Sequence, residues 1–271
     1  MRDKLFGPSA ERTDLVTYRW LPFWTVLRRE LHRFWGIKRQ TIFGPLLETY
    51  LYISIFGAAL GSRINELDGH SYIVFIIPGL LMMSFAINIF INNSFSILQQ
   101  KFQRAIDDQL ASPVSNTQLL MGFGLGGFFR GAIITSIAFI TAKVLIPELP
   151  VAHVWMCLLS FILIGFFFSM AGVLVGLKAE KFDDLSLYQT FILQPLIFLG
   201  GVFYSASLLP PLFEALTRIN PIYYMINTLR YSMLGHADVN PWISLLVIGV
   251  AGLVLFVINY RLFARGYKLR A

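Results

Sequence analysis

The chain has 271 residues, of which 56% are hydrophobic and 14% charged, and its formal net charge is +7. About a quarter of the residues of a soluble domain are charged, so this composition excludes an ordinary soluble globular protein and favours a polytopic membrane protein. The one cysteine, Cys157, excludes a disulfide framework and a cysteine-based metal site.

Residues 1–40 lack the apolar core and cleavage site of a signal peptide. They contain an amphipathic stretch whose apolar residues recur at helical spacing, and these are Trp24, Leu27, Leu31, Phe34 and Trp35. Such a helix lies in the membrane interface, with its arginines among the lipid headgroups. The pattern fits both a simple anchor and an active element.

Six apolar segments follow the amphipathic stretch. Five reach the roughly 20 residues that a bilayer crossing needs, and the fifth in chain order is shorter and contains Pro195. The segments are Ile42–Gly61, Ile73–Leu98, Leu119–Ala142, Trp155–Leu177, Leu187–Tyr204 and Trp242–Phe263. The expected fold class is therefore all-α integral membrane, with six transmembrane helices over residues 41–265 and a basic tail over 266–271.

Charge sets the expected orientation. Seventeen lysines and arginines lie in residues 1–40, the second and fourth connections and the C-terminal end, against four in the other connections. This positive-inside bias predicts that both termini are cytoplasmic. Because the basic residues lie at the membrane edges and not in a separate patch, we expect no nucleic-acid partner.

The second connection contains a short charged helix that ends before Pro113. Its apolar ridge and adjacent acids are Phe102, Ile106, Leu110, Asp107 and Asp108. A ridge of this size fits a groove on a cytoplasmic partner. Spacing alone leaves an ordinary solvated loop helix as the alternative.

Ionisable residues within a span are functional candidates by default. Glu48 in the first span and Arg130 in the third form an intramembrane ion pair in one interpretation and part of a relay in another. Asn88, Asn92 and Asn93 in the second span either bond to neighbouring helices or line a pore.

Glycines recur at four-residue spacing in the third and fourth spans. The pairs are Gly122/Gly126, Gly127/Gly131 and Gly172/Gly176. Small residues at this interval let helices approach closely, either within one bundle or between two copies of the chain.

The segment between the fifth and sixth spans is apolar but broken by Pro210–Pro211 and Asn220–Pro221. It predicts two short helices, the second running to Leu234 and ending at Gly235, as an outer re-entrant hairpin. Glu214 and Arg218 are spaced for an i,i+4 ion pair. Arg230 has no partner within a turn, so we expect it to meet a backbone carbonyl, a lipid phosphate or an acid on another span.

"FLGGVFYSASLLPPLFEALTRINPIYYMINTLRYSMLG" closely resembles the signature region of type 2 ABC exporter permeases. The matching elements are Gly200–Tyr204, Leu209–Pro210, Asn220–Pro221 and Arg230–Tyr231. "DDQLASPVS" at Asp107–Ser115 and "KFDDLS" at Lys181–Ser186 resemble the two cytoplasmic loops of this bacterial family, and the resemblance extends over essentially the whole chain.

The resemblance implies a permease in the bacterial inner membrane that exports an amphiphilic, lipid-linked, glycan or drug-like substrate. It implies that two copies of this chain form a homodimer in contact with membrane lipids, and that this dimer binds two separate ABC ATPase subunits. The chain has no Gly-x4-Gly-Lys-Ser/Thr phosphate loop. We therefore expect no cofactor on this chain and no enzyme activity of its own, with ATP and magnesium bound by the ATPase.

The resemblance also assigns site residues. Lys101–Pro113 would be the coupling helix that contacts the ATPase, and Leu208–Leu234 would lie beneath the outer gate, with Glu214, Arg218, Tyr223, Tyr224 and Arg230. Pro195 in the fifth span frees a backbone carbonyl, which favours a protein- or water-facing environment. The expected substrate pathway comprises Asn88, Gln189, Gln194, Phe198 and Phe203.

Two other classes are weighed against an exporter permease. A secondary transporter would show paired inverted repeats with broken helices, and only one broken segment is evident. A membrane-embedded transferase would gather histidines or acids at one interface. The four histidines lie in different connections, at His32, His70, His153 and His236.

Overall fold

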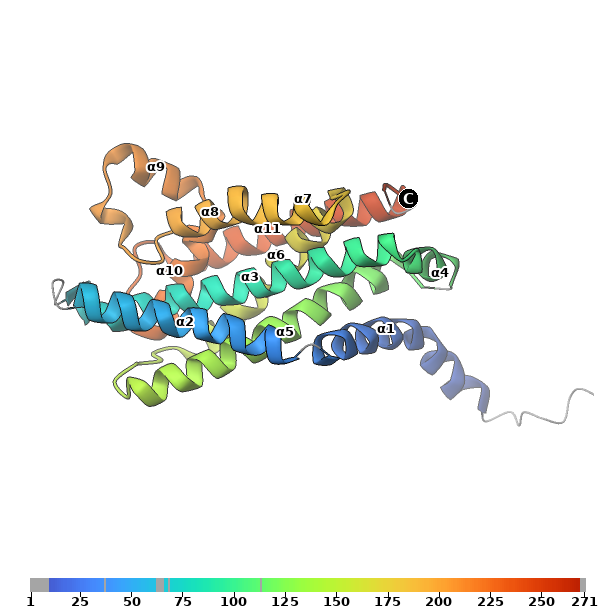
Figure 1. The fold of residues 1–271 in the computed structure, drawn as a ribbon, viewed down its shortest axis with the longest axis horizontal. Coiled ribbons are helices and arrows are strands. Elements are labelled where there is room, and N and C mark those ends of the chain that lie inside the picture. Colours follow the sequence, from blue (N-terminus) through green and yellow to red (C-terminus); the bar gives the residue numbers. More distant parts are fainter. Residues whose placement is uncertain (1–9, 37, 62–65, 68, 113, 269–271) are drawn as a thin grey trace, which may run out of the picture.

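The computed structural model describes residues 10–36, 38–61, 66–67, 69–112 and 114–268. In this part of the chain the protein is an elongated bundle of helices whose long members run along one axis (Figure 1). Those helices are α2 (Lys38–Gly61), α3 (Tyr72–Phe102), α5 (Asn116–Leu145), α6 (Val154–Lys178) and α11 (Pro241–Ala264). A rod made of α7 (Phe182–Leu187), the π-helix η1 (Tyr188–Leu193) and α8 (Gln194–Leu199) runs beside them.

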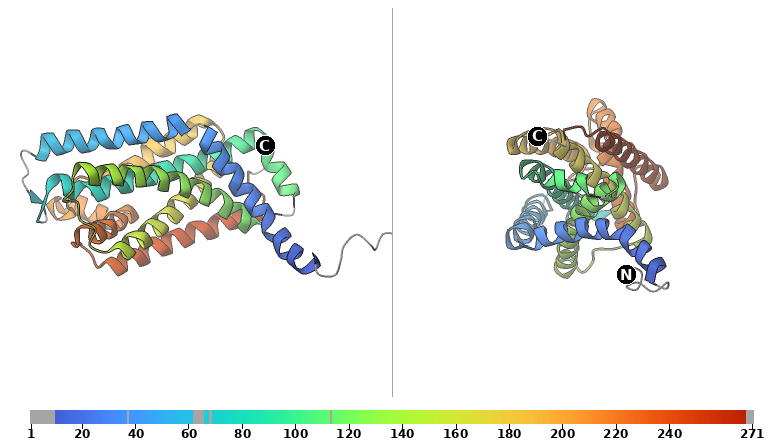
Figure 2. Two further views of the ribbon diagram at one scale, coloured as in Figure 1. Left: turned by 90° about the horizontal axis from the view of Figure 1, so that it is seen from below. Right: turned by 90° about the vertical axis from the view of Figure 1, so that its right-hand side faces the viewer.

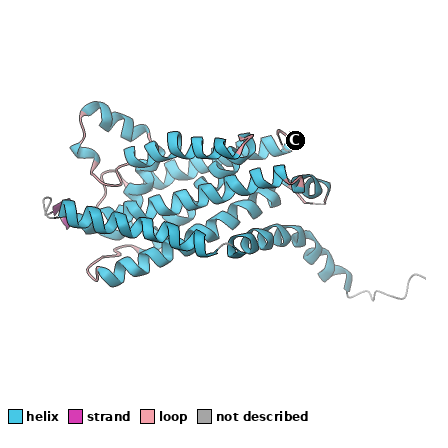
Figure 3. Ribbon diagram, viewed as in Figure 1, coloured by secondary structure: helices cyan, strands magenta, loops and turns pink. Residues whose placement is uncertain are grey.

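Shorter elements mark the two ends of the bundle (Figure 1). One end, which we call the α4 end, contains α4 (Ala105–Ala111), α1 (Ala10–Gly36) and the C-terminal part of α11. At the other, here the α9 end, lie the 3₁₀ turn η2 (Ala206–Leu208), α9 (Pro211–Ile219) and α10 (Pro221–Leu234). The strands β1 (Glu66–Leu67) and β2 (His70–Ser71) form a small antiparallel hairpin, the only strands in the described part (Figure 3).

Four helices, α3, α5, α6 and α11, are long and apolar enough to cross a bilayer. The described apolar part of α2, Thr41–Phe56, is shorter, and the α7–η1–α8 rod changes helix type along its length. The expectation of an all-α membrane protein is confirmed. The count of six spans remains a prediction.

Helix α3 is the centre of the bundle. Of its most apolar window, 89% is buried, against 22% for α11 at the periphery. It packs against α2, α5, α6 and α10, and its Phe75, Phe85 and Ile89 are buried in the main apolar core. In the end-on view of Figure 2 the other helices surround it.

The close approach of α1 to α5 depends on glycine. A Cβ atom added at Gly126 would lie 2.5 Å from the Cβ of Glu30, and one added at Gly122 would lie 2.7 Å from a methyl carbon of Val26. Both contacts are shorter than van der Waals distance, so α1 reaches this position only because α5 has no side chain there. Figure 2 shows α1 running obliquely at this end of the bundle.

The other paired glycines face α3. Cβ atoms added at Gly172 and Gly176 would lie 2.7 Å from the carbonyl oxygens of Phe90 and Ser94, and Gly131 faces Ile89. The spaced glycines of α5 and α6 are therefore used for packing within one bundle, the first of the two interpretations that the sequence allows.

The apolar stripe predicted for the interfacial helix divides between buried and exposed residues, and its place in the membrane interface remains a prediction. Leu27 and Phe34 are buried against the protein, at 4% and 2% exposure, whereas Trp24 and Trp35 of the same predicted stripe are 59% and 56% exposed. The arginines expected among lipid headgroups divide as well. Arg33 makes its hydrogen bonds inside the protein, because the face of α1 that turns toward α5 also carries a buried carboxylate, that of Glu30.

The broken segment forms two helices with the expected bounds. Asn220 caps α10 by accepting a hydrogen bond from the N–H of Ile222, and Gly235 ends α10 with φ +78°. The predicted pair forms, with Arg218 and Glu214 2.6 Å apart. The two helices differ in setting: α10 is buried against α3, α6 and α11, while α9 lies at the edge of the α9 end with exposed apolar residues (Figure 1). Whether they form a re-entrant hairpin remains a prediction.

We predict that Gly126→Ala destabilises the protein by about 1–3 kcal/mol, the usual cost of forcing an extra carbon into a packed contact. The control is Gly249→Ala in α11, where an added Cβ meets no atom within 4 Å. Thermal unfolding in detergent measures both variants. Equal melting temperatures would contradict the proposed role of Gly126.

Candidate functional site

The predicted coupling ridge is wrong at Ile106, which faces the interior of the protein. Arg104 takes a left-handed conformation with φ 54°, which turns α4 sharply away from α3. Ile106 consequently points into the bundle, is 1% exposed and joins an apolar cluster with Val26, Leu119 and Phe123. It anchors α4 to its own chain and is not available to a partner.

The other predicted coupling residues have different settings. Phe102 is 56% exposed and Asp108 is exposed, while Asp107 is half-buried. The side chain of Leu110 lies outside the described part of the structure. Among the described side chains of this connection, the outward-facing surface is formed by the end of α3 and one side of α4.

A second loop completes that surface. The ring of Phe182, at the start of α7, stacks on Phe102 with centroids 5.0 Å apart and planes at 17°. Lys101 donates from Nζ to the carbonyls of Leu177 and Ala179 at 2.9 and 2.8 Å, so α3 closes the C-terminal end of α6. We call this exposed stacked pair, with its flanking loop residues, the Phe102–Phe182 surface.

Local hydrogen bonds hold the second loop. The backbone N–H groups of Glu180 and Lys181 donate to the carboxylate of Asp184 at 2.7 and 3.0 Å, and these bonds lower the pKa of Asp184. Lys268 bonds to Glu180 at 2.5 Å, which ties the chain beyond α11 to the same loop. These contacts fix the shape of the loop at the start of α7, where Phe182 lies.

About halfway along the helices, a cavity of about 220 Å³ opens between α2, α3, α5 and η1. Its polar wall contains Glu48, Asn88, Arg130 and Gln189, four residues that the sequence assigned to two separate sets. Asn88 is buried and donates to the carbonyl of Ser84 at 2.8 Å. We call this the polar cavity.

Glu48 and Arg130 line the same cavity without forming the direct pair that the sequence suggested. The guanidinium of Arg130 donates to the side-chain oxygen of Asn92 at 3.4 Å, and Glu48 is exposed. The ion pairs among the described side chains do not include one between these two residues. Opposite charges thus face a shared space, and a direct contact is absent.

The fifth predicted span contains a π-helical turn, η1, directly before α8 and its Pro195. The N–H of Gln194 reaches back five residues to the carbonyl of Gln189, which is the π-helical pattern of η1. π-helical turns are frequent at functional sites because they turn side chains relative to the surrounding α-helix. Here the turn accompanies Gln189 at the polar cavity.

The remaining pathway residues lie elsewhere. Phe203 stacks on Phe56 of α2 at 4.4 Å and contacts Phe198 at 5.9 Å, so these rings form an aromatic cluster toward the α9 end. Gln194 is half-buried in α8 and is outside the polar cavity. The predicted pathway is therefore divided between a polar cavity and an aromatic cluster.

The predicted outer-gate residues also divide. Arg230 is 3% exposed, donates to the carbonyl of Gly201 at 2.9 Å and lies over the ring of Phe75 at 3.9 Å. Of the three expected partners, a backbone carbonyl is confirmed. A buried guanidinium needs hydrogen-bond and aromatic partners. Because these partners lie in the turn before η2 and in α3, Arg230 connects α10 to both.

The two tyrosines are bonded locally. Tyr223 is buried and donates to Asp238 at 3.4 Å, and Tyr224 donates to the carbonyl of Arg218 at 2.8 Å. Of the predicted gate residues, Glu214 and Arg218 lie on α9, where they form an ion pair.

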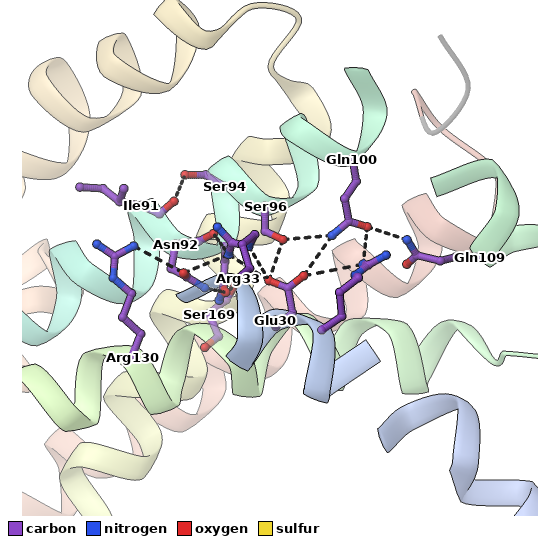
Figure 4. A network of polar contacts seen from close by, with 12 residues as sticks. Glu30, Arg33, Ile91, Asn92, Ser94, Ser96, Gln100, Gln109, Arg130 and Ser169 are labelled. Atoms are coloured by element: carbon purple, nitrogen blue, oxygen red, sulfur yellow. Dashed lines mark hydrogen bonds and ion pairs between the residues drawn. The ribbon is translucent and has the colours of Figure 1, made fainter. Parts of the chain in front are cut away.

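Sequence reasoning missed a buried polar network centred on Glu30, which is 1% exposed (Figure 4). Its carboxylate accepts from Arg33 at 2.9 Å, Ser96 at 2.7 Å and Gln100 at 3.0 Å. Burial also lowers the pKa of the neighbouring Arg29, although Glu30 opposes that shift. The signal was present in the sequence, because Glu30 is an acid between two arginines on a helix that also carries buried apolar residues.

Comparison with known proteins gives a consistent result. A family model described as "ABC-2 type transporter" matches residues 22–234. The chain is 39% identical over 253 residues to the inner membrane transport permease YadH of Escherichia coli strain K12, covering 93% of this chain and 98% of that one. It is 27% identical over 223 residues to nodulation protein J of Rhizobium meliloti strain 1021, covering 80% and 82%.

We predict that Arg230→Ala costs about 1.5–3 kcal/mol of stability, the usual contribution of a hydrogen bond from a charged group. Arg218→Ala is the matched control, because that exposed ion pair is worth at most about 1 kcal/mol. Thermal unfolding in detergent gives the comparison. If both variants melt at the temperature of the parent, Arg230 is not the tie between α10 and α3.

Proposed function

The chain belongs to the ABC-2 type transporter family, and from this membership we propose that it is the permease subunit of an ATP-driven exporter in the bacterial inner membrane. The name of the E. coli relative, an inner membrane transport permease, supports this location. The observation that carries the proposal is the pairing of a polar cavity inside the bundle with an exposed aromatic surface at one end.

The Phe102–Phe182 surface is where we place the ATPase. Stacked, exposed aromatic rings bury a large apolar area when a partner covers them, and aromatic residues dominate the energetics of interfaces. Arg104 and Asp108 beside the pair supply both signs of charge for orientation. ATP and magnesium bind on that partner, and two such subunits serve a dimer of this chain.

The polar cavity is the proposed substrate site. It joins an amide on α3, an amide on η1 and opposite charges on α2 and α5, and the apolar residues Met83, Ile87 and Ile91 complete its wall. A polar headgroup on an apolar molecule suits such a site, because the buried polar groups need partners while the surrounding surface favours hydrocarbon. The substrate would be an amphiphile moving outward, with both termini of the permease in the cytoplasm.

Phe102→Ala combined with Phe182→Ala should abolish copurification with co-produced ABC ATPase subunits from the same organism. Loss of a central aromatic anchor costs about 2 kcal/mol or more, so affinity should fall at least about 30-fold. The control is Phe213→Ala on α9, which removes an exposed ring at the opposite end. Unchanged copurification and ATP hydrolysis in the double variant would contradict the assignment.

Single cysteines placed in a Cys157→Ser background test the topology. Ala215→Cys and His236→Cys at the α9 end should react with an impermeant thiol reagent from the periplasmic side of intact cells. Gln103→Cys at the α4 end should react only after the membrane is opened. Labelling of positions 215 and 236 from different sides would add a span and exclude the re-entrant hairpin.

A further inference from the structure

We propose that Glu30 is a positioning residue that mechanically links α4 to the polar cavity. The link runs through hydrogen bonds across α1, α3 and α5, so that displacement of α4 changes the position of Arg130 in the cavity wall (Figure 4). This inference rests on the proposed function, in which α4 lies beside the ATPase and the cavity holds the substrate.

The first half of the link joins α4 to α1. Gln109 of α4 donates from Nε2 to Oε1 of Gln100 on α3 at 2.6 Å. Gln100 in turn donates from its own Nε2 to Oε1 of Glu30 at 3.0 Å and to the hydroxyl of Ser96 at 3.1 Å. The three side chains Gln109, Gln100 and Glu30 are 9%, 5% and 1% exposed, so water competes little for these bonds.

The second half joins α1 to the cavity. Oε2 of Glu30 lies 2.9 Å from the guanidinium of Arg33. Arg33 donates to Oδ1 of Asn92 at 3.0 Å, and the same oxygen accepts from Arg130 at 3.4 Å. Arg130 lines the polar cavity with Glu48 and Gln189. Asn92 therefore connects an arginine of the network to the arginine of the cavity.

The carboxylate is the centre because it is the one acid among the described members of the network. Its oxygens bond to both sides: Oε1 accepts from Gln100 on the α4 side, while Oε2 accepts from Arg33 on the cavity side and also from Ser96 of α3. A buried charge holds its partners strongly, since losing one leaves an uncompensated ion. In Glu30→Gln the side chain has the same size but only one acceptor oxygen and no charge. The hydrogen bonds in both halves of the link are therefore weakened.

Close packing makes α1 and α4 move together. Glu30 lies directly over Gly126, at a distance where α5 admits no further carbon atom. Ile106 of α4 is packed in the cluster that also holds Val26 of α1. A push on α4 is thus transmitted to α1 as a shift of the helix, and the carboxylate moves with it, because packed cores deform little.

The test uses accessibility of the cavity, which needs no knowledge of the substrate. A Gln189→Cys, Cys157→Ser permease is assembled with its ATPase in lipid nanodiscs. The reaction rate with the small cationic thiol reagent methanethiosulfonate ethylammonium is measured without nucleotide and with ATP and vanadate. Glu30→Gln and, as matched control, Glu148→Gln are added in turn. Glu148 is an exposed carboxylate in the connection between α5 and α6.

We expect the reaction rate to change at least about fivefold on trapping in the parent and in Glu148→Gln, and less than about twofold in Glu30→Gln. ATPase binding should be retained by all three. An unreduced response in Glu30→Gln overturns the link while leaving the proposed function intact. No response in the parent, or no complex with an ATPase, overturns the proposed function and the link together.

A second variant covers failure of Glu30→Gln to fold. Gln109→Leu keeps the volume of the side chain but removes its bond to Gln100, so it breaks the link at the α4 end without touching the buried acid. The change in reaction rate on adding ATP and vanadate should again be less than about twofold. Adding Glu30→Gln should reduce this change no further, since both substitutions interrupt one path. A full response in Gln109→Leu overturns the link.

Discussion

Burial of the Glu30 carboxylate is the constraint on which the α4 end of this protein depends. A carboxylate taken out of water must be surrounded by cations and hydrogen-bond donors. Here those donors come from α1 and α3. The acid can reach them only because Gly126 removes the side chain that would hold α1 away from α5. One backbone position in a spanning helix therefore decides where an N-terminal helix sits, and that helix in turn decides where α4 is held.

The α9 end is stabilised by a cation in the same manner. Arg230 is buried in α10, donates to the backbone carbonyl of Gly201 and lies over the face of Phe75. Because Gly201 has φ +90°, its carbonyl takes an orientation that other residues reach only with strain. The two ends thus use opposite charges for one purpose: each fixes a short helix against α3.

The sequence predicts the long helices well and the roles of their connecting segments less well. Hydropathy identifies α3, α5, α6 and α11, because a spanning segment must be apolar over its length whatever it packs against. Breaks at Asn220–Pro221 and Gly235 are equally local and were placed correctly. Periodicity shows that Ile106 and Phe102 belong to an apolar pattern, but it cannot show which faces inward. The left-handed turn at Arg104 decides that, and nothing in the residue type announces it.

The same limit explains why Glu30 and the polar cavity escaped prediction. Ser96 and Gln100 are 66 and 70 positions from Glu30 in the sequence. At such separations only the packing of the helices brings residues together. The positive-inside rule adds a further lesson, since it counts Arg33 and Lys101 as charges at the membrane edge. In the structure Arg33 neutralises a buried acid and Lys101 closes the end of α6. Cations that favour one orientation of the chain therefore also bind its helices together, and a substitution that leaves the charge bias unchanged can still separate them.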